Sequence, residues 1–241
     1  TASDPSCFVG VLYIRGETIV WDQVVFEEAL RPLVADYKSD KLRGVTQPRM
    51  GEFTETFKDL REIAEGDGRL LFAFSEREID ELRERLPKEE LDWWEANLLN
   101  VRKYAVKWKR KNHPDAVFKS VKFRGGKNSL DNFLNLIRFD VPPILGPGNS
   151  AQRIRYVRDM LNKWGGDPNK LTAVAKGKWT KALNHNLYDC IGTRHLMIEI
   201  HKDQFKRLGV VGDWENYYST MSFDAEAQIV RHLGKFLKEA S

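Results

Sequence analysis

Strand-like patterns are confined to the first third of this 241-residue chain, and that distribution constrains the fold more than any other feature. Residues 7–14 form an apolar run rich in β-formers, and residues 18–21 form a second, so together they predict a β-hairpin. A helical stripe over residues 52–65 is followed by a buried strand at residues 69–74. Strands that alternate with helices are typical of an α/β sheet with crossover connections.

From residue 88 onward the periodicity is helical. One long helix is predicted from Lys88 to about Trp108, and other helices are predicted over residues 24–38, 76–86, 129–139, 150–164, 168–183, 185–208 and 223–239. Residues 141–148 form a rigid, proline-rich connector. We therefore predict a single α/β domain over residues 1–241, with a sheet part at 1–86 and a mainly helical part at 87–241.

Composition limits the class of protein. Uncharged apolar runs are far shorter than the roughly 18 residues of a membrane span, and no signal peptide is visible, so the chain is expected to be cytoplasmic. Cys7 and Cys190 lack the partners of a disulfide framework or a zinc site, and free thiols in a reducing compartment are expected.

Charge is strongly segregated along the chain. Residues 1–100 carry 13 Lys and Arg against 22 Asp and Glu, whereas residues 101–241 carry 26 against 13. The first part therefore has a net charge of −9 and the second a net charge of +13. This asymmetry favours a polyanionic partner for the second part.

The segment 101–127 concentrates this positive charge. It holds ten Lys and Arg, with Asp115 as its only acid, and Tyr104, Trp108, Phe118 and Phe123 are interleaved. Basic groups neutralise phosphates and flat rings stack on unpaired bases, which suits single-stranded nucleic acid. The alternative is a solvated helix face whose aromatic side chains belong to the core. The residues predicted to bind nucleic acid are Lys107, Trp108, Lys109, Arg110, Lys111, Lys119, Lys122, Arg124 and Lys127.

His185 precedes Asp189 by four residues, in the segment Asn184–Cys190, and this spacing makes the two side chains neighbours on one helix face. An imidazole beside a carboxylate is the minimum for metal-assisted hydrolysis, in which one group holds a cation and the other moves a proton. A solvated or capping pair is the alternative interpretation of the same spacing.

In order and spacing the chain resembles the RNase H-like superfamily, in its branch of DEDD-type 3′–5′ exonucleases and predicted nucleases. Residues 8–13 are similar to the apolar-Gly-apolar strand of that family, and residues 70–82 to its strand followed by an acidic helix. Residues 185–190 are similar to its last motif, with His185 in the place of a tyrosine, and residues 128–133 fit a helix upstream of it.

The resemblance implies an RNase H-like mixed sheet, made of the hairpin and a crossover strand, and phosphodiester hydrolysis with two Mg²⁺ or Mn²⁺ ions. It implies that Asp189 and either Glu78 or Asp80 are metal ligands, and that His185 orients or deprotonates the water. The Asp-x-Glu strand of the family would precede the hairpin, where this sequence holds only Thr1–Ser6. The chain is therefore an exonuclease-like enzyme if that strand is supplied, or else an inactive nucleic-acid-binding or scaffolding module. A helical domain that binds an acidic protein is a third interpretation.

Overall fold

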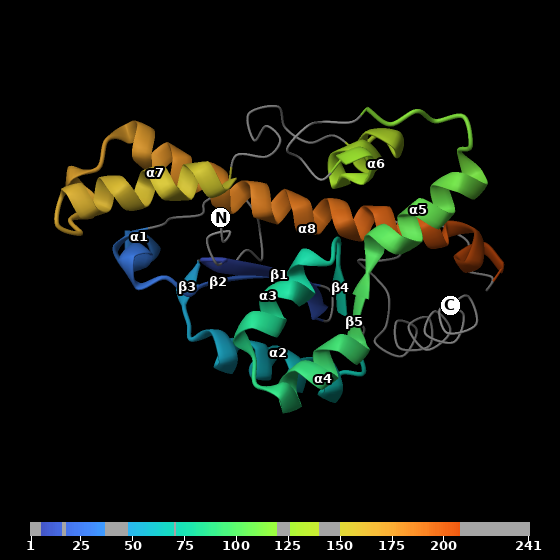
Figure 1. The fold of residues 1–241 in the computed structure, drawn as a ribbon, viewed down its shortest axis with the longest axis horizontal. Coiled ribbons are helices and arrows are strands. Elements are labelled where there is room, and N and C mark those ends of the chain that lie inside the picture. The colour runs from blue at the N-terminus through green and yellow to red at the C-terminus, as the bar shows by residue number, and fades with distance from the viewer. Residues whose placement is uncertain are drawn as a thin grey trace.

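The computed structural model describes residues 6–15, 18–36, 48–69, 71–119, 126–139 and 150–207 (Figure 1). The predicted helix at 223–239 and the connector at 141–148 lie outside these residues. Strand β1 (Phe8–Arg15) pairs with β2 (Thr18–Val25) in an antiparallel hairpin, with Phe8 opposite Val25. The predicted hairpin is confirmed, and β2 continues four residues beyond the predicted strand. A short strand, β3 (Arg49–Met50), adds to β2 in parallel.

The helices that follow the hairpin pack into two apolar cores, since η1 and α1 belong to a different cluster from the next three helices. The 3₁₀-helix η1 (Glu28–Leu30) leads into α1 (Arg31–Asp36), and α2 (Phe53–Gly66) is capped by the Glu52 side chain, which accepts from the Glu55 amide at 2.8 Å. Helices α3 (Arg77–Arg85) and α4 (Lys88–Asn97) follow. The buried side chains of α2, α3 and α4, with Leu86 at the end of α3, form one cluster, which consists of Phe53, Phe57, Ile79, Leu82, Leu86 and Trp94.

The structure corrects two predictions about the middle of the chain. The strand predicted at residues 69–74 exists as β4 (Leu71–Ala73), but it pairs in parallel with β5 (Leu98–Asn100) in a separate two-stranded sheet. The continuous helix predicted from Lys88 to Trp108 is wrong, because β5 divides it into α4 and α5 (Val101–Asn112). Pairing with β4 holds residues 98–100 extended, and the Asn100 side chain then caps α5 by accepting from the Lys103 amide.

The helical part is organised around one long helix. After η2 (Gly126–Asn128), α6 (Leu130–Leu136), α7 (Ser150–Lys163) and η3 (Pro168–Lys170), the helix α8 runs from Ala173 to Arg207. Two helices predicted at 168–183 and 185–208 are therefore one, since no proline interrupts the sequence between them. A 35-residue helix is roughly 50 Å long at about 1.5 Å per residue.

Helix α8 connects the cluster of η1 and α1 to a third core. Its first half packs on α7 and the hairpin end through a buried cluster that includes Val157, Leu161 and Trp179. Its second half packs on α5 and α6 through a cluster that includes Val101, Ala105, Phe133, Leu196 and Met197. Figure 1 shows α2, α3 and α4 on one side of α8 and α6 on the other, while α7 runs alongside the first half of α8, near α1. The described chain is thus mixed α/β and mainly helical. None of its described helices combines the length and the apolar character that a membrane crossing requires.

Candidate functional site

Close approach of α8 to β1 positions the His185 and Asp189 side chains. A Cβ atom added to Gly10 in β1 would lie 2.0 Å from the Asn186 Oδ1 atom and 2.3 Å from the Trp21 ring, so only glycine fits at this crossing. The Gln23 side chain reinforces the contact, because its Nε2 atom donates to the Leu183 carbonyl at 3.1 Å and to Asn186 Oδ1 at 3.2 Å. These contacts fix the rotation of α8 about its axis, and therefore fix where residues 185 and 189 point.

The two side chains are neighbours, as the spacing predicts. The His185 Nε2 atom lies 3.6 Å from Asp189 Oδ2, which is longer than a hydrogen bond. The His185 side chain is 13% exposed and the Asp189 side chain 43% exposed. Burial lowers the pKa of His185, and the charge of Arg153 lowers it further. Burial also raises the pKa of Asp189 to about 7, and the carboxylates of Asp131 and Glu78 add to this effect. The pair at neutral pH is therefore an uncharged imidazole beside a partly protonated carboxyl group.

Two carboxyl groups from distant segments influence Asp189. Asp131 in α6 and Glu78 in α3 both act electrostatically on Asp189. Asp80, the alternative to Glu78, instead forms an ion pair with Arg83 at 2.8 Å on the exposed face of α3. The contribution of Asp131 was missed, because in the sequence it is only the acidic residue of a short amphipathic helix. The structure therefore brings Glu78 toward Asp189 and leaves Asp80 apart from it.

The acidic group does not offer a metal-binding set. No three His, Cys, Asp or Glu side chains within the described ranges are close enough to hold one ion. One Glu78 oxygen, Oε2, accepts from the Ser75 hydroxyl at 2.7 Å and from the Ser75 amide at 3.2 Å. The Ser75 hydroxyl also accepts from the Arg77 amide at 3.3 Å, so these bonds tie the residues before α3 to its first turn. Two-metal chemistry at Asp189, Glu78 and Asp80 thus finds no geometric support, and no reaction step follows from these residues.

The thiol of Cys190, next to Asp189 in the sequence, is also not activated for reaction. The Cys190 Sγ atom donates to the Gly10 carbonyl at 3.5 Å, and burial raises the pKa of this thiol above its usual range. Within the described residues neither Cys7 nor Cys190 forms a disulfide, and both are half-buried.

A stripe of exposed basic side chains runs along α5. Val101 and Ala105 are fully buried against α6 and α8, so this helix turns one face inward. The opposite face carries four exposed basic residues at the spacing i, i+4, i+7 and i+8, which are Lys103, Lys107, Arg110 and Lys111. Lys103 is neutralised by Glu76, whose carboxylate lies 2.6 Å away. The remaining three members belong to the predicted nucleic-acid-binding set.

Two further lysines of that set are brought together by a side chain that the sequence analysis did not single out. The Asn132 amide donates to the Lys119 carbonyl at 3.0 Å and to the Lys127 carbonyl at 2.9 Å. These bonds bring residues 119 and 127 together, and both lysine side chains are exposed. Lys122 and Arg124, predicted for the same surface, lie outside the described residues. We call the exposed members Lys107, Arg110, Lys111, Lys119 and Lys127 the α5 basic surface.

The aromatic residues of this segment are mostly engaged internally. Phe118 packs edge-on against the buried Phe133 ring, and the Lys109 ammonium lies 4.9 Å from the Phe118 centroid. Trp108 makes an edge contact with His113, with the ring centroids 4.8 Å apart. Lys109 and Phe118 therefore hold the end of α5 against the core, and the positive charge of the stripe is its main accessible feature.

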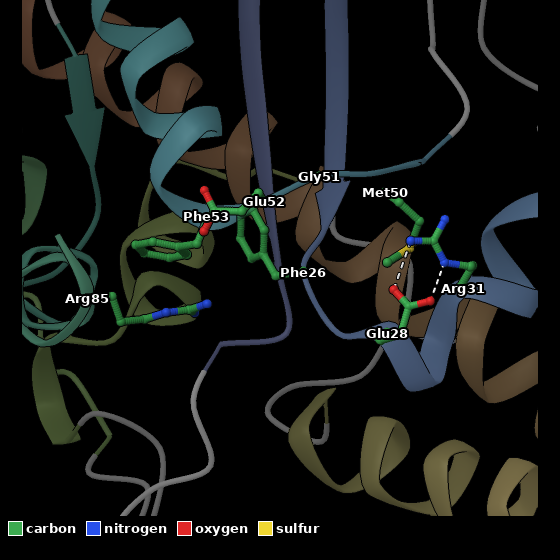
Figure 2. A pocket seen from close by; sticks show the side chains of 8 residues that line it. All are labelled: Phe26, Glu28, Arg31, Met50, Gly51, Glu52, Phe53 and Arg85. Carbon is green, nitrogen blue, oxygen red and sulfur yellow. Dashed lines mark hydrogen bonds and ion pairs between the residues drawn. The ribbon is translucent and has the colours of Figure 1, made fainter.

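A separate recess of about 530 Å³ opens where η1, β3, α2 and α3 meet (Figure 2). On one side Arg31 pairs with Glu28, with a bond of 2.8 Å from Arg31 Nη2 to Glu28 Oε2. On the other, the Arg85 guanidinium stacks 3.6 Å from the Phe53 centroid and donates to the Ser6 carbonyl at 3.0 Å. Both cations already have partners within the protein, so the recess is explained by packing between these elements.

Comparison with known proteins gives short, strong matches to one kind of enzyme. A segment of 44 residues, or 18% of the chain, is 84% identical to the isoleucine–tRNA ligase of Pelagibacter ubique and covers 5% of that protein. A 39-residue match to the isoleucine–tRNA ligase of Bradyrhizobium diazoefficiens is 56% identical, and covers 16% of the chain and 4% of the ligase. A 41-residue match to the isoleucine–tRNA ligase of Francisella tularensis subsp. novicida is also 56% identical, over 17% and 4%. The chain thus spans about a twentieth of the length of these curated relatives. No protein-family description and no solved structure matches the chain.

These matches overturn the predicted family. The chain was expected to resemble RNase H-like exonucleases, yet the relatives found are isoleucine–tRNA ligases. The predicted phosphodiester hydrolysis, and the nuclease and exonuclease assignments that came with it, are therefore corrected. The residues that suggested the resemblance are loose matches to short motifs, whereas the ligase matches are high in identity over a continuous segment.

Proposed function

We propose that this protein binds RNA through the α5 basic surface. The observation that carries the proposal is the exposed stripe on α5, continued by Lys119 and Lys127, whose carbonyl groups both bind Asn132. Residues 101–119 contain seven Lys and Arg against one Asp, and Lys103 pairs with Glu76. A surface with this excess of positive charge attracts phosphates, because each contact releases counterions from the nucleic acid.

A purely structural role explains only part of the stripe. Cations in the last turn of a helix interact favourably with its dipole, by about 0.3–1 kcal/mol each. That effect accounts for Arg110 and Lys111, which lie in the last turns of α5. It does not account for Lys119 and Lys127, which lie beyond the helix. A phosphate-bearing partner explains these two lysines together with the exposed charges of α5.

The choice of RNA is supported by the ligase matches, since the named substrate of those relatives is a tRNA. The aminoacylation reaction itself is not proposed for this chain, because the matched segment covers only 4–5% of each ligase. A binding role is also consistent with the His185 and Asp189 pair, from whose geometry no reaction step follows.

The proposal is tested with a charge-neutralising double variant, Arg110→Gln with Lys111→Gln, and fluorescence anisotropy of a labelled RNA. The binding constant K falls with salt, so a plot of log K against log salt has a negative slope. Removing two phosphate contacts should make this slope shallower by about 1.4–1.8. The matched control is Lys58→Gln with Lys88→Gln, which removes the same charge from α2 and α4 on the other side of α8 (Figure 1). Equal slopes for the two double variants would contradict the proposal, because general charge would then explain the binding.

A further inference from the structure

The end of the molecule formed by α7 and the start of α8 is a second surface rich in basic and aromatic groups. Residues 150–183 contain eight Lys and Arg against two Asp. One of the eight, Arg158, is bound by Glu27 from the front of the chain, and Lys170 lies 3.9 Å from Asp167. The excess positive charge is comparable to that of the α5 basic surface, yet it lies on different elements.

An exposed tryptophan stands at the tip of this hairpin of helices. Trp164 directly follows α7 and is 39% exposed, and its amide donates to the Leu161 carbonyl at 3.0 Å, which fixes its backbone. Gly165 and Gly166 then turn the chain with φ values of 63° and 83°, which favour glycine. The Lys163 ammonium lies 5.3 Å from the Trp164 centroid, and Val174 nearby is 61% exposed. The described core leaves this ring accessible beside a cation.

A second cation–aromatic pair connects the two helices of this hairpin. The Lys178 ammonium in α8 lies 3.7 Å from the centroid of the Tyr156 ring in α7. Flat rings flanked by lysines are the groups that proteins use to hold single strands, because the ring stacks on a base while the cation meets the adjacent phosphate. We define the hairpin surface as Tyr156, Lys163, Trp164 and Lys178.

Helix α8 sets the distance between the two surfaces. Its first residue, Ala173, lies beside the hairpin tip, and Leu196 packs on Val101 and Ala105 of α5. At about 1.5 Å per residue, these two points of α8 are roughly 35 Å apart. In Figure 1, α7 lies alongside the first half of α8, and α5 crosses its second half. A strand that runs along α8 can therefore meet both surfaces.

We propose that the hairpin surface is a second nucleic-acid contact, and that one extended single strand of RNA binds across it and the α5 basic surface. This inference rests on the RNA binding proposed above. A separation of roughly 35 Å corresponds to about ten nucleotides at about 3.4 Å each along a stacked strand. Two contacts on one strand raise the overall affinity through effective concentration, provided that the strand spans both.

The test measures binding of labelled oligouridylates of about 5, 10 and 20 nucleotides, whose lengths bracket the expected span. Four proteins are compared: the full chain, the hairpin variant Lys163→Gln with Trp164→Leu, the α5 variant Arg110→Gln with Lys111→Gln, and the control Lys58→Gln with Lys88→Gln. Circular dichroism checks that each variant is folded, and Trp164 is exposed enough for its replacement to leave the cores intact.

For the full chain and the control, affinity should rise at least about tenfold from the shortest to the longest oligomer, as expected when a second contact becomes reachable. The hairpin variant should bind the shortest oligomer through α5 and lose most of that rise. An unchanged rise in the hairpin variant would overturn the second contact. If the hairpin variant weakens binding of a fully paired RNA duplex as much as it weakens binding of the single strand, the single-strand assignment is overturned.

The outcome also separates the two proposals. Should the α5 variant bind every oligomer as the full chain does, while the hairpin variant loses binding, the α5 function and the two-point arrangement both fail and the hairpin alone remains. Should the full chain bind none of the oligomers but still bind the labelled RNA with the salt dependence described above, the two-point arrangement fails and RNA binding through α5 remains. Loss of the length-dependent rise in both double variants, with the control unaffected, supports one strand across both surfaces.

Discussion

Three glycine-to-alanine substitutions test the packing of α8 in opposite directions. At Gly10 the added methyl group would lie 2.0 Å from Asn186 Oδ1 and 2.3 Å from the Trp21 ring. At Gly177, inside α8, it would meet nothing within 4 Å. At Gly192 it would lie 2.7 Å from the Leu134 Cδ1 atom. The same chemical change therefore samples a rigid contact, open space and a contact with the end of a flexible side chain.

The expected free energies follow from two opposing effects. Alanine in place of a helical glycine stabilises by about 1 kcal/mol, and in a strand by somewhat less. Overpacking costs about 1–3 kcal/mol, and Gly10→Ala falls at the upper end because two groups must move. Trp21 is only 2% exposed, and Asn186 is held by Gln23 at 3.2 Å, so neither has room to yield. We therefore expect a net loss of about 2 kcal/mol for Gly10→Ala, a gain of about 1 kcal/mol for Gly177→Ala, and a value near zero for Gly192→Ala.

Urea unfolding followed by circular dichroism gives these differences directly, and thermal melts should shift by about 2–4 °C for each kcal/mol. Gly177→Ala is the matched control, since it makes the same substitution on the same helix that Gly10 contacts. A stabilising effect of Gly10→Ala comparable to that of Gly177→Ala would refute the reasoning, because α8 could not then cross β1 at residue 10.

Three further results are expected. Asp189→Asn should stabilise the protein at pH 8 by about 1–2 kcal/mol, after discounting for the 43% exposure of the side chain, and the gain should vanish below about pH 4. The sign follows because the folded-state pKa of Asp189 is raised to about 7, so its ionisation costs stability as the pH rises from about 4 to 7. Urea titrations of both proteins across that range measure the difference in unfolding free energy. A difference that does not change with pH would contradict the prediction. Cys190 should react with iodoacetamide at pH 8 much more slowly in the folded protein than in urea, since burial keeps it a thiol, and mass spectrometry of the labelled peptide would expose equal rates if this is wrong. Mg²⁺ at millimolar concentration should leave the melting temperature of Asp189→Asn and of the unmodified chain equally unaffected, and a shift seen only in the unmodified chain would restore the predicted metal site.

Local patterns were sufficient where a segment decides its own structure. The stripe of Phe53, Phe57 and Leu60, ended by Gly66, defines α2 almost to the residue. The hairpin is equally local, because its two strands are neighbours in sequence. The basic stripe on α5 was also within reach, since helical spacing alone places Lys107 and Lys111 on one face.

The errors occurred where distant segments decide the structure. Residues 98–100 are extended because β4 pairs with them, and nothing in Leu98–Asn100 itself interrupts a helical pattern. The approach of Asp131 and Glu78 to Asp189 depends on three elements whose relative placement no spacing rule contains. The motif at residues 185–190 resembles the last landmark of a nuclease, although its visible contacts are those of Asn186 and Cys190 with the hairpin.

The fold separates in space the acidic and basic parts that are separated along the sequence. Residues 53–97, which contain α2, α3 and α4, carry 14 Asp and Glu against seven Lys and Arg, and Figure 1 shows these helices apart from α7 and from the C-terminal end of α5. A polyanion approaching the protein is thus repelled by one side and attracted by the other, so the field orients it before contact. Because the rigid helix α8 holds the hairpin surface and the α5 basic surface at a fixed separation, an oriented strand that meets one surface is already aligned with the second. This requires that the rate of association fall steeply with salt for the unmodified chain, and that replacing acids on α2 leave the bound geometry unchanged while altering that rate alone.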